Sequence, residues 1–65
     1  MSELAKAVLC FLQVETAKGK KSFTATCLTV VGKISDVRAK QIIDELEVSG
    51  YIEVHNNIAN TFSLI

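Results

Sequence analysis

The chain has 65 residues, of which 49% are hydrophobic and 22% are charged, and it contains no proline. This composition excludes a disordered chain and predicts one packed domain over residues 1–65, whose small core leaves little room for an enclosed substrate cavity, so we expect no enzyme. Seven Lys and Arg residues balance seven Asp and Glu residues, which excludes the strongly basic net charge of most nucleic-acid-binding domains.

The first predicted helix lies in residues 2–15, SELAKAVLCFLQVE, with Ser2 as its N-cap. One helical stripe carries five apolar residues: Leu4, Ala7, Val8, Phe11 and Leu12. Further apolar residues flank this stripe: Ala5, Leu9, Cys10 and Val14. The band is broader than a two-layer core requires. Either a partner, such as a second copy of the chain, contacts this helix, or the extra residues are scattered over the surface.

A polar loop is predicted at residues 16–21, TAKGKK, because the segment contains the first glycine and little that is apolar. Three of the seven basic residues lie in it: Lys18, Lys20 and Lys21. A solvated loop is the simplest interpretation. Contact with phosphate is the alternative, because flexible lysines hold a phosphate backbone without reading its sequence.

Local signals conflict in residues 22–35, SFTATCLTVVGKIS. The β-branched residues favour a strand, yet Thr24 is placed to cap a helix and Gly32 to end it in a left-handed conformation. We therefore predict a short helix here, preceded by a brief strand near Ser22 and Phe23. Ile34 would fill the corner before the next helix, which gives a helix-turn-helix.

The third predicted helix starts at a Ser35 cap and runs to about Ser49, where Gly50 ends it. Its apolar residues recur on one face: Ala39, Ile42, Ile43 and Leu46. The opposite face is polar. This helix therefore has an apolar side for the core and a free side for a partner.

A β-hairpin is predicted after Gly50, because the hydrophobic pattern changes from helical spacing to alternation. Its inner face comprises Ile52, Val54, Phe62 and Leu64, and its turn residues include Asn56, Asn57 and Asn60. Together the segments predict a small α+β fold of three helices with a C-terminal hairpin.

The charges are unevenly distributed along the chain. All seven basic residues precede Gln41, and six of them lie in residues 18–40: Lys18, Lys20, Lys21, Lys33, Arg38 and Lys40. Four acidic residues follow it: Asp44, Glu45, Glu47 and Glu53. This arrangement favours a domain with one basic side, although charges that merely keep the surface soluble are an equal alternative.

Metal and catalytic chemistry find no support in the sequence. Cys10 and Cys27 are too few for a zinc cluster, and the single His55 does not complete a ligand set, so we predict no metal, no cofactor and no catalytic residue. Both cysteines are predicted to be buried packing residues. No signal peptide or run of about 18 apolar residues is found, which favours a cytoplasmic protein without membrane contact.

The segment VGKIS, followed by AKQIIDELEVSGYIEV, resembles the helix-turn-helix and wing of the winged-helix superfamily. In that superfamily a Ser-capped recognition helix ends in a leucine, an acidic residue, two variable residues and a glycine, which here are Leu46 to Gly50. The resemblance covers nearly the whole chain. It indicates the superfamily without selecting among its regulators, phage and plasmid proteins, replication factors and motor-protein targeting domains.

In DNA-binding members of this superfamily the recognition helix enters the major groove of double-stranded DNA. The resemblance then implies base contacts by Val37, Arg38 and Gln41, because arginine pairs with guanine and glutamine with adenine. It implies phosphate contacts by Lys18, Lys20, Lys21, Lys33, Lys40, Asn56 and Asn57.

Two functional hypotheses follow. The first is a small DNA-binding protein, a transcriptional regulator or replication accessory factor that acts as a homodimer through its first helix. The second is a winged-helix module that binds another protein and not DNA, through the broad apolar face of its first helix or the acidic end of its third helix. The neutral net charge favours the second. The wing turn, NNIAN, contains no Arg or Lys, which disfavours contact of the wing with the minor groove. No small-molecule substrate is expected under either hypothesis.

Overall fold

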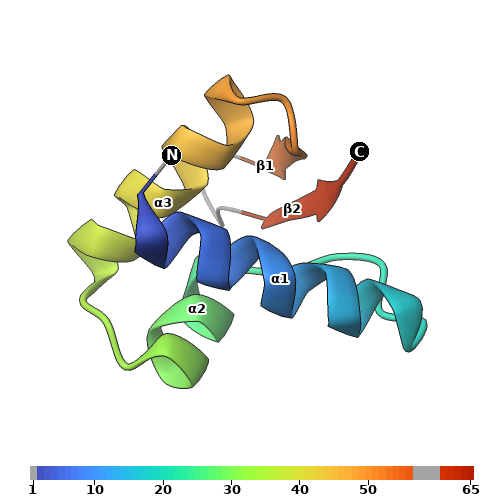
Figure 1. The fold of residues 1–65 in the computed structure, drawn as a ribbon, viewed down its shortest axis with the longest axis horizontal. Coiled ribbons are helices and arrows are strands. Elements are labelled where there is room, and N and C mark those ends of the chain that lie inside the picture. Colours follow the sequence, from blue (N-terminus) through green and yellow to red (C-terminus); the bar gives the residue numbers. More distant parts are fainter. Residues whose placement is uncertain (1, 57–60) are drawn as a thin grey trace.

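The computed structural model describes residues 2–56 and 61–65. Its elements, in chain order, are α1 (Glu3–Ala17), α2 (Ala25–Gly32), α3 (Asp36–Val48), β1 (Ile52–Asn56) and β2 (Thr61–Leu64). Three helices are thus followed by a two-stranded antiparallel hairpin (Figure 1). The predicted α+β fold is confirmed, and the layout is that of a winged helix.

All three helices begin at the predicted caps. The Ser2 hydroxyl accepts from the Ala5 amide at 3.1 Å, and the Ser35 hydroxyl accepts from the Arg38 amide at 3.1 Å. Thr24 caps α2 in the same way, because its hydroxyl accepts from the Cys27 amide at 3.3 Å. Each hydroxyl satisfies an N–H group that has no partner within its helix. This capping supports a helix at α2 despite its β-branched residues.

The turn between α2 and α3 differs from the prediction in one residue. Gly32 is the last helical residue, and the left-handed backbone conformation belongs to Lys33, with φ 52°. The prediction of a left-handed Gly32 was therefore wrong. Reversing the chain one residue later returns Ile34 to the core, where it is partly buried. Gly50, with φ 83°, follows the end of α3 as predicted.

The core lies between the helices and the inner face of the hairpin. The predicted apolar face of α3 is fully buried: Ala39, Ile42, Ile43 and Leu46. From the hairpin, Ile52 and Phe62 are buried, while Val54 and Leu64 are partly buried against the same cluster. The hairpin register pairs Ile52 with Leu64 and Val54 with Phe62, which places these four residues on one face of the sheet.

The core-facing stripe of α1 differs from the predicted one. Its buried residues are Ala5, Val8, Leu9 and Leu12. Leu4 and Phe11 are only partly buried, and Ala7 is exposed. Because apolar residues surround much of this helix, its sequence alone does not define which side faces α3 and β2.

The predicted strand near Ser22 and Phe23 is reduced to a single bridge. Phe23 pairs with Phe62 through two backbone hydrogen bonds, of 2.7 Å and 2.9 Å. Their rings stack with centroids 5.9 Å apart. The loop after α1 is thereby fastened to β2 through one residue.

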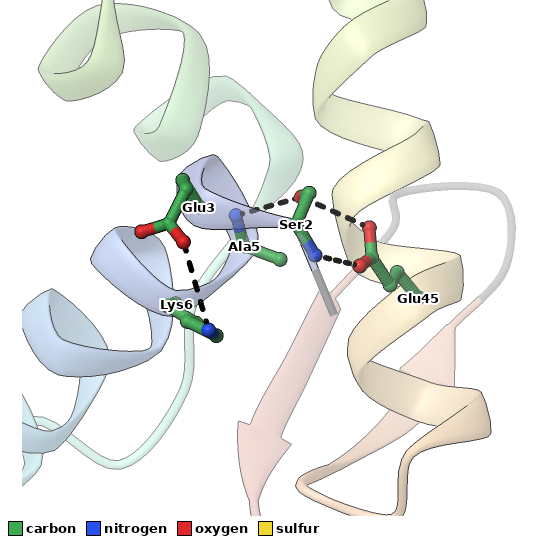
Figure 2. Close-up of polar contacts among 5 residues, drawn as sticks. All are labelled: Ser2, Glu3, Ala5, Lys6 and Glu45. Atoms are coloured by element: carbon green, nitrogen blue, oxygen red, sulfur yellow. Dashed lines mark hydrogen bonds and ion pairs between the residues drawn. The ribbon is translucent and has the colours of Figure 1, made fainter.

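A polar contact joins the start of α1 to α3. The amide and the hydroxyl of Ser2 both donate to the carboxylate of Glu45, the hydroxyl at 3.2 Å (Figure 2). Glu3 and Lys6 form a separate exposed ion pair of 3.6 Å on α1. Ser2 thus caps its own helix and also links the helix to the middle of α3.

Cys10 is exposed and Cys27 is half-buried, and both are free thiols. The prediction that both are buried was wrong for Cys10, because it lies outside the core-facing side of α1. Among the helices in residues 2–56, none combines the length and apolar content needed to cross a membrane.

Candidate nucleic-acid interface

The first two turns of α3 present the three predicted base-contacting residues on the surface. Val37 is 70% exposed, Gln41 is exposed and Arg38 is partly exposed. The Arg38 guanidinium donates through Nη1 to Gln41 Oε1 at 3.1 Å. Residues three apart on a helix are neighbours on its surface, which allows this contact. A guanidinium and an amide are therefore held side by side on the free face of α3.

Lys40 and Lys33 lie close to this pair along the chain, and both are exposed. Lys40 Nζ is 3.5 Å from Asp44 Oδ1, and the two side chains are 49% and 58% exposed. An ion pair this exposed contributes little to stability, because water and salt screen it. Lys40 can therefore exchange Asp44 for another anion at small cost.

Lys33 occupies the turn that leads into α3. A left-handed conformation is unfavourable for a residue with a Cβ atom, whereas glycine adopts it readily. We expect Lys33→Gly to raise the free energy of unfolding by about 0.5 to 1 kcal/mol. Glycine relieves the backbone strain of the folded state, and this gain exceeds the loss caused by the larger conformational entropy of glycine in the unfolded chain. Urea denaturation measures the change.

The matched control for this substitution is Lys21→Gly, which removes an exposed lysine that lacks a positive φ. That variant should be neutral or slightly less stable than the wild type. Equal losses of stability in both variants would contradict the strain assigned to Lys33.

The loop lysines are remote from the α3 group. Figure 1 shows the C-terminal end of α1 and the start of the following loop on one side of the molecule, and the turn before α3 on the other side. Lys20 Nζ is 5.3 Å from the centroid of the Phe23 ring and 3.9 Å from Cys27 Sγ. The predicted phosphate contacts thus come from two segments of the chain, Lys33 and Lys40 from the turn before α3 and its first half, and Lys18, Lys20 and Lys21 from the loop after α1.

The wing contributes fewer described residues to the candidate interface. The backbone of Asn56 forms the last residue of β1. The side chain of Asn56 and all of Asn57 lie outside the described residues. His55 Nε2 and Ser63 Oγ are 2.7 Å apart across the two strands. The pairing shifts between Val54 and Asn56, which places a bulge at this end of β1.

At the acidic end of α3, which the second hypothesis assigns to protein binding, exposed apolar side chains were not predicted. Val48 is 88% exposed and Tyr51 is 44% exposed, and exposed Glu47 is adjacent in the sequence. The available signal was spacing, because Val48 is two residues beyond Leu46 and therefore off the buried stripe. This end of α3 is acidic and apolar, whereas its beginning is basic and polar.

No cluster of three or more potential metal ligands is found among the side chains that the structure describes.

The candidate interface consists of Lys33, Val37, Arg38, Lys40 and Gln41, all from the turn before α3 or from its first half. Comparisons with protein-family models, curated proteins and solved structures find no match to this chain.

Proposed function

We propose that this chain is a DNA-binding protein of the winged-helix superfamily that inserts the first half of α3 into the major groove of double-stranded DNA. In this proposal it acts in the cytoplasm as a transcriptional regulator or a replication accessory factor. The observation that carries the proposal is the exposed Arg38–Gln41 pair, joined at 3.1 Å next to the capped start of α3.

The pair has the donors and acceptors needed to read base edges. Arginine donates two hydrogen bonds to guanine O6 and N7, and glutamine donates to N7 and accepts from N6 of adenine. The methyl groups of exposed Val37 suit the methyl group of thymine. Because Arg38 and Gln41 touch each other, we expect them to read neighbouring base pairs.

Phosphate binding falls first to Lys33 and Lys40, which are exposed on either side of Arg38 in the sequence. The positive end of the α3 dipole favours an anion at the same place, although exposed Asp36 in the first turn repels a phosphate directly beside it. Lys18, Lys20 and Lys21 follow the C-terminal end of α1, so in this proposal they contact phosphates of a flanking segment. Asp44 and Glu47 repel phosphate at the second half of α3. In this proposal the first half of α3 is therefore the part that enters the major groove.

The test is a salt titration of duplex DNA binding by the full 65-residue chain, followed by fluorescence anisotropy. Three to five phosphate contacts predict that log Kd rises with log salt concentration with a slope of about 3 to 4.5. Lys33→Ala should lower this slope by about 1, because it removes one phosphate contact.

Lys20→Ala, at a proposed contact to a flanking phosphate, should weaken binding equally for all sequences. Lys6→Ala is the matched control, since it removes the same charge from α1, where no DNA contact is proposed, and it should leave the slope unchanged. A chain that binds no duplex DNA even at low salt would contradict the proposed function.

A second candidate function is protein binding through the C-terminal end of α3. The observation that favours it is the exposure of Val48 and Tyr51 beside acidic Glu47, a surface that suits an apolar segment with basic residues. This candidate is preferred if the salt titration detects no DNA binding.

A further inference from the structure

An apolar groove lies between α1 and α2, and its lining ends at Gly32, the residue before Lys33. Its volume is about 130 Å³, and its walls include Leu4, Ala7, Val8, Phe11, Leu28 and Val31. Val31 in its wall is 53% exposed, and the same two helices also expose Val14 and Val30, by 49% and 70%. Apolar surface left in water is unfavourable, and burying it in an interface would stabilise the chain.

Three residues of α1 form a row along the groove, Leu4, Ala7 and Phe11, and exposed Val14 continues this row at helical spacing. Their spacings are three, four and three, so the row has the same pattern when it runs in either direction. An antiparallel second copy therefore places Leu4 opposite Val14 and small Ala7 opposite large Phe11. A two-fold symmetric interface requires this kind of self-complementarity.

The charges at the ends of α1 favour the same arrangement. Exposed Glu3 lies in the first turn, where it pairs with Lys6 at 3.6 Å, while exposed Lys18 follows the last turn and precedes Lys20 and Lys21. An antiparallel copy brings Glu3 of one α1 near Lys18 of the other, keeps the two lysine-rich ends apart and opposes the helix dipoles favourably. A parallel copy would bring six lysines together. Charge therefore selects a second, antiparallel α1 as the occupant.

We propose that the α1–α2 groove is a homodimer interface, occupied by α1 of a second copy in antiparallel orientation. By symmetry each α1 also contacts the other copy's α2, which gives a four-helix arrangement. The groove lining comes from α1 and α2 and contains no residue of α3, so Val37, Arg38 and Gln41 stay outside the dimer interface. The dimer does not depend on DNA binding, and each can be tested without the other.

Sedimentation equilibrium of the full chain tests the proposal. The wild type should give twice the chain mass of 7.1 kDa. Ala7→Glu should raise the dimer dissociation constant about a hundredfold, because it places an unpaired charge opposite Phe11 of the second copy. Ala7 is exposed in the single chain, so the fold should survive, and circular dichroism verifies this. Val14→Glu is a second variant with the same expectation.

Gln13→Glu is the matched control, because it adds the same charge to exposed α1 surface off the row, and it should leave the dimer intact. A wild type that stays monomeric up to about 1 mM would overturn the proposal. Equal effects of Ala7→Glu and Gln13→Glu would also overturn it, because another surface would then form the dimer.

A charge exchange tests the orientation. Lys18→Glu should weaken the dimer about threefold at low salt, and adding Glu3→Lys should restore the wild-type dissociation constant. A double variant that is no tighter than Lys18→Glu alone would overturn the antiparallel arrangement.

Discussion

Phe62→Ala should lower the free energy of unfolding by about 3 to 5 kcal/mol, the largest stability effect we expect from a single substitution in this chain. The side chain is fully buried, and its ring stacks on Phe23. Removing the ring leaves a cavity where the hairpin meets the loop after α1. Because a chain of this length has a total stability of about 3 to 10 kcal/mol, much of the variant should be unfolded at 25 °C.

Urea denaturation followed by circular dichroism measures this loss. Val48→Ala is the control, since Val48 is 88% exposed and its truncation should change stability by about 0.5 kcal/mol at most. Phe62→Leu gives a graded response of about 1 to 2 kcal/mol if the alanine variant does not fold. Similar midpoints for Phe62→Ala and Val48→Ala would show that Phe62 does not hold the hairpin to the helices.

Arg38→Ala has the largest expected effect on the proposed function. We expect it to weaken binding to the preferred DNA sequence by about tenfold to a hundredfold, because a bidentate contact to guanine is lost. Binding to unrelated sequences should weaken much less. The preferred sequence comes from selection on random duplexes, and anisotropy then compares the two classes of DNA.

Two controls separate base recognition from charge. Arg38→Lys keeps the charge but loses the planar fork, so it should retain non-specific binding and lose discrimination. Lys6→Ala removes a cation that is paired with Glu3 on α1, and both classes of DNA should bind it nearly as tightly as they bind the wild type. An equal loss on all sequences in Arg38→Ala would indicate a phosphate contact and contradict base recognition.

Helix starts and the α3 face were predictable because their causes are local. Ser2, Thr24 and Ser35 each cap the helix that they precede, and their hydroxyls need only an amide three residues away. The buried face of α3 follows from residues at helical spacing with polar residues between them. The hairpin faces follow in the same way from strict alternation. These features determined the order of elements and the α+β class.

The candidate site was predictable in part for the same reason. Val37, Arg38 and Gln41 lie on the free face of α3 because its opposite face is fixed by Ile42 and Leu46. The division of the lysines was not predictable, because it depends on where the loop after α1 is fastened. Lys20 is held near Phe23, and Phe23 is bridged to Phe62, nearly forty residues further along the chain.

The sequence by itself determined the helices, their caps, the hairpin and the free face of α3, because each depends on contacts within a few residues. Only the tertiary structure decided which side of α1 is buried, where the loop lysines lie and which residue carries the left-handed turn. Apolar residues on several sides of α1 leave its rotation open until α3 and β2 pack against Ala5, Leu9 and Leu12. The side of α1 that is buried depends on apolar contacts with residues far along the chain, and the spacing of residues within α1 does not specify those contacts.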